Sequence, residues 1–145
     1  MTYEADLTEN GRERPVGYLA RGHSFTKGMV AEVFFDCLVA LVEQPFLVSP
    51  GYHTCDLGWF CGGLSLGWEL PKFRYKGRLI RLGNTDILVP GDEVVYRAPS
   101  LILHYIRRHR YLPPQCFVKA VLNCPTPGSK EYAAAITTIA PEWAD

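Results

Sequence analysis

The sequence lacks a net charge, a long apolar run and a targeting segment. Its 15 Lys and Arg residues balance 15 Asp and Glu residues, so no global field would attract nucleic acid or anionic lipid. No stretch approaches the roughly 18 consecutive apolar residues that a membrane-spanning helix needs. The N-terminal residues are polar and acidic and have neither the basic flank nor the apolar stretch of a signal peptide. We therefore expect a cytoplasmic protein that contacts neither nucleic acid nor membrane.

Recognisable catalytic machinery is also scarce. There is no Cys-x-x-Cys pair, and no acid–base pair of carboxylates can be chosen from 15 scattered acidic residues. Without an export signal, the five cysteines are expected to be reduced thiols and not a disulfide scaffold. We therefore predict a protein that is not an enzyme and needs no cofactor. The alternative in this class is a thiol enzyme that uses Cys55 or Cys61, with Asp56 orienting a histidine base.

What is present is enough apolar surface for one domain. The 145 residues are 48% hydrophobic, which is ordinary for a single globular unit. Residues 1–14 are charged and without periodicity, so we interpret them as an N-terminal arm that precedes a domain at 15–145. The predicted fold class is α+β, with an antiparallel sheet of about four strands and about four helices packed mainly on one face.

The clearest helical pattern spans about residues 28–43. Apolar residues recur there at helical spacing and would form one wide buried face, comprising Val30, Val33, Phe34, Cys37, Leu38 and Leu41. Val39 intrudes into the polar stripe opposite, and Pro45 follows the helix end. Before this helix, residues 16–20 are typical of a short strand.

Strand patterns dominate the middle of the chain. Between Lys72 and Arg78, basic and aromatic residues alternate with the period of an extended segment. Strands at 79–82, 86–89 and 93–96 are separated by turn residues, which indicates an antiparallel meander. The last third predicts helices from Pro99 or Ser100 to Arg108, after Pro113-Pro114, and after a capping Ser129.

Metal-ligand residue types cluster in the glycine-rich loop at residues 51–63. His53, Cys55 and Cys61 are three of the four ligands that a tetrahedral zinc site needs. Their spacing is wider than that of a zinc knuckle, and the fourth ligand would have to come from elsewhere. The structural alternative is an ordered loop whose cysteines are small buried hydrophobes. Zinc is therefore the alternative cofactor prediction, after none.

Two basic segments are candidate binding surfaces. In the strand at 72–78, alternation would place the charges and the rings on opposite faces, so that they could not act together on nucleic acid. Arg107, Arg108 and Arg110 form a second basic patch that suits an acidic protein partner. His104 and His109 are five residues apart, about 140° around a helix, so both cannot point at one ion from a regular helix.

The chain resembles a family of small uncharacterised bacterial proteins. The resemblance rests on Gly51-Tyr52-His53-x-Cys55, on the hairpin that follows, and on the segment from Ala98 to Pro114 with its His-Tyr-Ile-x-x-His-x-Tyr-x-Pro-Pro pattern. It implies a bacterial cytoplasmic protein, adds weight to His23, His53, Cys55 and His104, and supplies no activity or substrate. Family members often carry His-x-Cys-x-x-Cys in the loop, whereas this chain has Gly58 at the second Cys position.

These observations predict a binding or interaction module, of an accessory or immunity type, that recognises a protein partner. Aromatic residues on a loop are frequent contact residues, and arginines near them would add charge. The predicted contact surface comprises Tyr52, Trp59, Phe60, His104, Arg107, Arg108 and Arg110.

Overall fold

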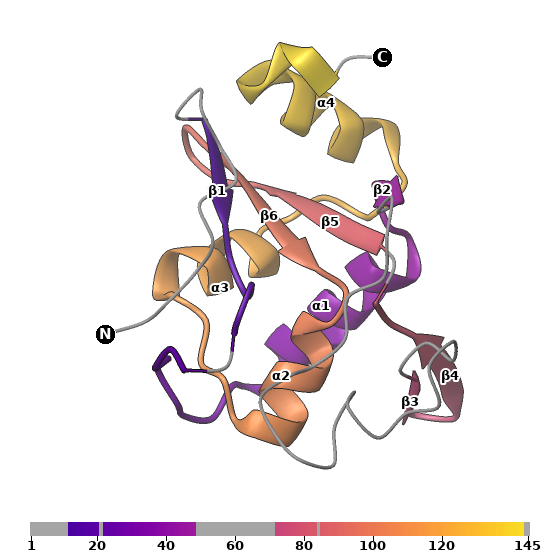
Figure 1. Ribbon diagram of the computed structural model, residues 1–145. Coiled ribbons are helices and arrows are strands. Elements are labelled where there is room, and N and C mark those ends of the chain that lie inside the picture. The colour runs from indigo at the N-terminus through magenta and orange to yellow at the C-terminus, as the bar shows by residue number, and fades with distance from the viewer. Residues whose placement is uncertain (1–11, 21, 49–71, 84, 144–145) are drawn as a thin grey trace.

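The computed structural model describes residues 12–20, 22–48, 72–83 and 85–143. The fold is α+β, as the sequence predicted, and combines a mixed sheet, a separate hairpin and four α-helices (Figure 1). The strands are β1 (Glu13–Pro15), β2 (Leu47–Val48), β3 (Lys72–Tyr75), β4 (Arg78–Arg81), β5 (Thr85–Pro90) and β6 (Val95–Pro99). The helices are α1 (Glu32–Glu43), α2 (Ile102–His109), α3 (Gln115–Leu122) and α4 (Lys130–Ile139), followed by the short 3-10 helix η2 (Pro141–Trp143).

The main sheet has the strand order β1-β6-β5-β2. β5 pairs antiparallel with both β6 and β2, while β1 runs parallel to β6 and makes the sheet mixed. Glu13 of β1 lies opposite Val95, so segments far apart in the sequence are joined here. The strand predicted at 16–20 is wrong in position, because the pairing residues are Glu13–Pro15, which begin inside the predicted arm.

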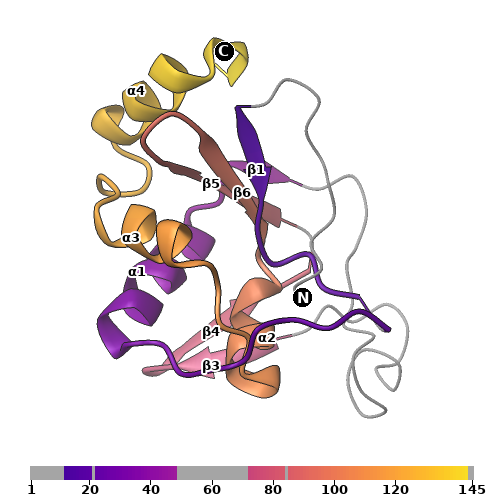
Figure 2. The ribbon, with the colours of Figure 1, turned by 90° about the vertical axis from the view of Figure 1, so that its left-hand side faces the viewer.

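β5 is the central strand, and its residues are buried from Asp86 to Val89. Helices α1, α3 and α4 all pack against β5, and Figure 2 shows them together on one side of the sheet. The predicted one-sided arrangement of helices is thereby confirmed.

β3 and β4 form a two-stranded sheet of their own, with Tyr75 opposite Arg78. The predicted single meander is therefore wrong, because among the described residues β4 does not pair with β5. The hairpin turn has Lys76 at φ 49° and Gly77 at φ 83°. Positive φ at both central residues is the mark of a type I′ turn, whose twist matches that of the strands.

Helix α1 begins at Glu32, later than the periodicity indicated. Val33 is 58% exposed, whereas Val39, which was interpreted as an intruder in the polar stripe, is fully buried. The buried face is therefore rotated from the predicted one and comprises Phe34, Phe35, Leu38, Val39, Leu41 and Val42. This rotation brings Phe35 beneath the hairpin.

Helix α4 begins as predicted. The Ser129 hydroxyl oxygen accepts a hydrogen bond from the Tyr132 backbone N–H at 3.1 Å. The Tyr132 hydroxyl donates to the Leu88 carbonyl and connects this helix to β5. Within the described ranges, no helix has the length and apolar character needed to cross a membrane.

Candidate functional site: a basic cavity between α1, α2 and the hairpin

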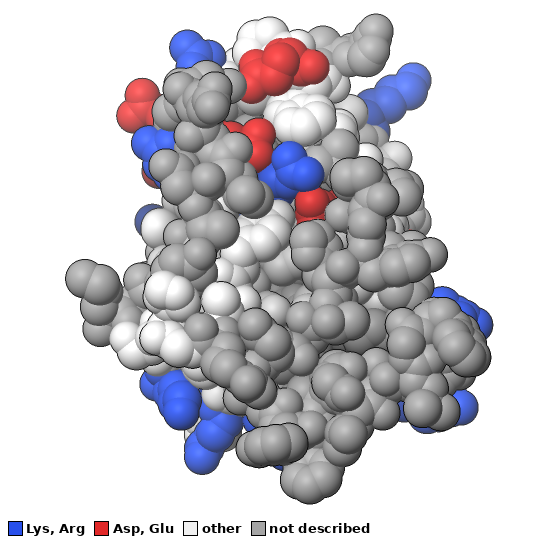
Figure 3. All heavy atoms as spheres, viewed as in Figure 1, with Lys and Arg blue, Asp and Glu red and all other residues white. Residues whose placement is uncertain are grey.

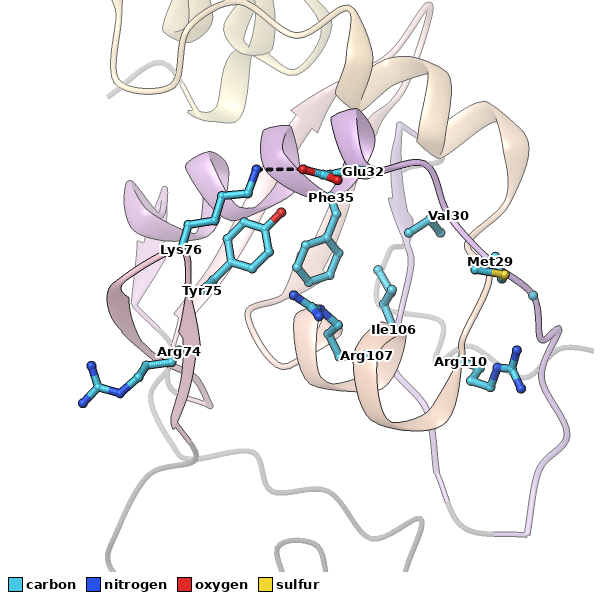
Figure 4. Close-up of a pocket in the computed structure, with 11 residues that line it drawn as sticks. Met29, Val30, Glu32, Phe35, Arg74, Tyr75, Lys76, Ile106, Arg107 and Arg110 are labelled. Atoms are coloured by element: carbon cyan, nitrogen blue, oxygen red, sulfur yellow. Dashed lines mark hydrogen bonds and ion pairs between the residues drawn. The ribbon is translucent and has the colours of Figure 1, made fainter.

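A cavity of about 580 Å³ opens between helix α1, the β3–β4 hairpin and the end of helix α2. Its lining residues are Gly28, Met29, Val30, Glu32, Phe35, Arg74, Tyr75, Lys76, Ile106, Arg107 and Arg110. Figure 4 shows Arg74 and Arg110 at opposite sides of the opening with Arg107 between them. Four cations and one carboxylate thus surround a floor of aromatic and aliphatic side chains.

The floor of the cavity is a stack of one guanidinium on two rings. The Arg107 Cζ lies 4.9 Å from the Phe35 ring centroid and 5.1 Å from that of Tyr75. The two rings meet edge to face, with centroids 5.2 Å apart. A guanidinium over an aromatic face contributes about 1 kcal/mol. The stack therefore fixes a cation at the centre of the cavity.

Polar contacts with α1 hold the hairpin wall in place. The Tyr75 hydroxyl donates to Asp36 Oδ1 at 2.5 Å, and Lys76 Nζ donates to Glu32 Oε2 at 2.9 Å and to Asp36 Oδ1 at 3.0 Å. The hydrogen bonds from Tyr75 and Lys76 lower the pKa of the Asp36 carboxyl below its ordinary value. Lys76 is itself paired with the lining carboxylate Glu32.

The end of helix α2 has an uncommon residue at its C-cap. Arg110 adopts the left-handed conformation, φ 59° and ψ 31°, where glycine is the usual choice. The Arg110 and Tyr111 N–H groups both donate back to the Tyr105 carbonyl, the latter at 3.1 Å. Gly28 N–H donates to the Arg110 carbonyl at 2.9 Å, so residues 26–28 lie beside the helix end. This pairing brings Met29, 83% exposed, to the cavity opening.

The two histidines of α2 are in contact although they are five residues apart on the helix. The ring centroids of His104 and His109 are 5.1 Å apart, edge to face. Burial, then the charges of His109 and Arg108, lower the pKa of His104 to about 4. Its Nε2 is buried and has no hydrogen-bond partner among the described residues.

Charge is unevenly distributed even though the net charge is zero. In Figure 3 the coloured acidic side chains gather in the upper half of the face, and the coloured groups at its lower end are all basic. Helix α2 and the hairpin, which line the cavity, lie at this lower end in Figure 1. An acidic ligand would therefore meet a local positive field that the overall composition conceals.

The structure brings together only part of the predicted site. Arg107 and Arg110 line the cavity, Arg108 lines a neighbouring cavity, and His104 lines neither of the two. Tyr52, Trp59 and Phe60 lie outside the described residues, as do the predicted ligands His53, Cys55 and Cys61. In the part of the chain that the structure describes, no three His, Cys, Asp or Glu side chains are grouped as a metal site requires.

Sequence reasoning missed the hairpin's contribution. The alternation predicts that Arg74 and Lys76 lie on the face opposite the ring of Tyr75, yet all three line one cavity. The alternation ends at the turn, where Lys76 leaves the strand and turns back over α1. The sequence does contain a signal for this contribution. Lys76 stands before Gly77 in a two-residue hairpin turn, where Asn or Asp is usual.

Two serine patterns used by hydrolases also occur in the chain and were overlooked. Gly63-Leu64-Ser65-Leu66-Gly67 lies outside the described residues. Ser24-Phe25-Thr26-Lys27 lies on a non-helical segment, where Lys27 forms a bridge to Tyr111. Residues three apart share a face on a helix, whereas an extended chain turns them to opposite sides. The second pattern therefore lacks the helical context in which its lysine would activate its serine.

Comparison with known proteins identifies a family whose function is unknown. The family model described as Domain of unknown function (DUF7919) matches residues 1–122. No curated protein matches the chain, and no solved structure does. The matched range includes all the residues that line the cavity.

Proposed function

The chain belongs to this family of unknown function, and we propose that it is a non-enzymatic binding module that holds an acidic segment of a partner protein in the basic cavity. The partner's carboxylates would contact Arg74, Arg107 and Arg110. Its apolar side chains would contact Met29 and Ile106. A bacterial source, a cytoplasmic location and an accessory or immunity role remain predictions.

The observation that carries the proposal is the backbone conformation of two lining cations. Lys76 and Arg110 are the two non-glycine residues with positive φ in the described chain, and both line the same cavity. In each of these conformations the backbone alone would favour glycine by about 1 kcal/mol. Unfavourable backbone conformations tend to persist where function requires the side chain. Lys76 and Arg110 thus each carry a long cationic side chain at a position where the backbone conformation favours glycine.

The chemistry of the floor favours protein over nucleic acid. Single-stranded nucleic acid binds by stacking its bases on open aromatic faces. Here the Arg107 guanidinium already covers a face of both Phe35 and Tyr75. A carboxylate can accept two parallel hydrogen bonds from such a guanidinium without displacing it. An acidic peptide with apolar side chains is therefore the occupant that fits best.

Fluorescence anisotropy with a labelled peptide rich in Glu, Asp and Leu would test the proposal. We expect saturable binding to the wild-type protein and at least about fivefold weaker binding to Arg107→Gln and Arg110→Gly, since a charge-assisted hydrogen bond contributes about 1.5–3 kcal/mol. Arg81→Gln is the matched control, because Arg81 is exposed on β4 and lines neither cavity. Equal weakening by all three variants, or tighter binding of a labelled oligonucleotide than of the peptide, would refute the proposal.

The zinc and thiol alternatives depend on residues outside the described ranges. Elemental analysis of protein purified without added metal separates zinc binding from the module proposed here. Selective alkylation of Cys55 near neutral pH would favour a thiol enzyme, because a reactive cysteine has a lowered thiol pKa.

A further inference from the structure

A second cavity, of about 400 Å³, lies on the other side of Arg110. Its lining residues are Gly22, His23, Phe25, Lys27, Arg108, His109 and Arg110. The described lining therefore holds three permanently charged cations and two imidazoles, and no carboxylate. Arg110 is shared with the first cavity, so a ligand in one can extend into the other.

The backbone fixes the relative positions of the two walls. The Lys27–Tyr111 bridge joins them, and the Leu112 N–H donates to the Thr26 carbonyl at 2.9 Å. Phe25 packs edge to face on the buried ring of Tyr111, with centroids 6.1 Å apart. Lys27 Nζ lies 5.4 Å from the Phe25 ring centroid, which holds the ammonium over that ring. The lysine thus sits on an ordered wall that is packed against the core.

The positive charge exceeds what the helix end requires. Cations in the last turn of a helix offset its dipole, which amounts to about half a negative elementary charge. Lys27, Arg108 and Arg110 together carry several times that charge. Burial, then the charges of Arg108 and Lys27, lower the pKa of His109, so both cations act on the interior of the cavity. This excess charge favours an anion of more than one charge.

We propose that this second cavity binds a phosphoryl group, carried on a phosphorylated serine or threonine of the acidic partner segment. The inference rests on the proposed function for its source of phosphate. A phosphoryl group brings about 1.5 to 2 negative charges and three acceptor oxygens near pH 7. Arg108 and Arg110 supply planar guanidinium donors for these oxygens, and Lys27 supplies a point charge. A carboxylate would neutralise only one of the three cations.

Two peptides that differ only by phosphate would test this inference. One carries phosphoserine within the acidic sequence and the other carries serine. We expect the phosphorylated peptide to bind the wild-type protein at least about tenfold more tightly than the serine peptide does, since charge-assisted hydrogen bonds contribute about 1.5–3 kcal/mol. Inorganic phosphate should compete for the second cavity and remove this difference in affinity between the two peptides.

Neighbouring arginines provide matched variants, because Arg107 lines only the first cavity and Arg108 only the second. Arg108→Gln should abolish the phosphate-dependent gain and keep the affinity for the serine peptide. Arg107→Gln should weaken both peptides and keep the gain. Lys27→Gln is a second variant for the case in which Arg108→Gln does not fold, as checked by thermal unfolding.

The possible results separate this inference from the proposed function. Equal affinity of the two peptides for the wild-type protein overturns the phosphoryl site and leaves the acidic-segment proposal standing. Failure of the serine peptide to bind, with a phosphate-dependent signal still lost in Arg108→Gln, overturns the acidic-segment proposal instead. Tighter binding of adenosine monophosphate than of the phosphopeptide would refute a protein source of the phosphate.

Discussion

Arg97 donates two hydrogen bonds to a single carboxylate oxygen of Asp86, from Nε at 3.1 Å and from Nη2 at 2.8 Å. The Asp86 side chain is 4% exposed and that of Arg97 is 24% exposed. Arg97 Nη1 also lies 3.5 Å from Glu13 Oε1, so one guanidinium connects β1, β5 and β6. The sheet is therefore joined by side chains as well as by its backbone.

Replacing Arg97 by glutamine should destabilise the protein by about 3 kcal/mol, because it leaves the Asp86 carboxylate buried without a cation. Urea unfolding of the single variant measures this loss. The double variant Asp86→Asn/Arg97→Gln should recover a large part of it, since the buried negative charge is gone. A single variant within about 1 kcal/mol of wild type would contradict the prediction.

Arg110→Gly should stabilise the fold by about 0.5–1 kcal/mol, because glycine adopts the left-handed C-cap conformation without steric penalty. The shift of the urea midpoint measures the gain. Arg108 lies within the last turn of α2, two residues before Arg110, and provides the control. Arg108→Gly should destabilise the fold by about 1 kcal/mol. A variant that is more stable and binds less would identify Arg110 as a residue kept for binding. Loss of stability in Arg110→Gly would refute the prediction.

His104 should make the fold acid-sensitive. Its folded pKa of about 4 lies below the ordinary value of 6.5, so the stability that it contributes is fully present above pH 6.5 and is lost as pH falls from there toward 4. The loss should reach about 1–2 kcal/mol after allowance for solvent screening of a partly exposed ring. Urea unfolding at neutral and acidic pH measures it. His104→Gln should reduce the decline, and an unchanged decline would assign it to other groups.

Ser129→Ala should destabilise the protein by about 1 kcal/mol, because the Tyr132 backbone N–H loses its capping acceptor at the start of α4. Ser129→Asp should keep most of the stability, since a carboxylate accepts the same hydrogen bond and favours the helix dipole. Thermal unfolding of the pair tests this. Equal loss in both variants would show that the cap is not the cause.

Sequence patterns predicted the parts of this fold that are stabilised locally. Ser129 with its apolar helix, the helix after Pro113-Pro114 and the strand within Asp86–Val89 are each encoded in a short window of sequence. β1 and β2 were missed because they have three and two residues, too short for any periodicity. Their pairing depends on partners far along the chain.

The candidate site shows the same division. Arg107 and Arg110 were identified as a basic patch because they lie together in the sequence. Arg74 and Lys76 were not joined to them, because the hairpin reaches α2 only after it packs on α1 through Tyr75 and Asp36. No sequence window contains that contact, so only the assembled fold could reveal the cavity.

The hairpin wall of the cavity has a consequence for motion. Among the described residues β3 and β4 share no ladder with the main sheet, and α1 holds them through Tyr75, Lys76 and Arg78. Exposed ion pairs of this kind weaken as salt rises. The hairpin is therefore expected to open as a separate unit, with amide exchange faster than that of β5 and further accelerated by salt. A ligand bridging the hairpin and α2 would slow that exchange without any change in the sheet.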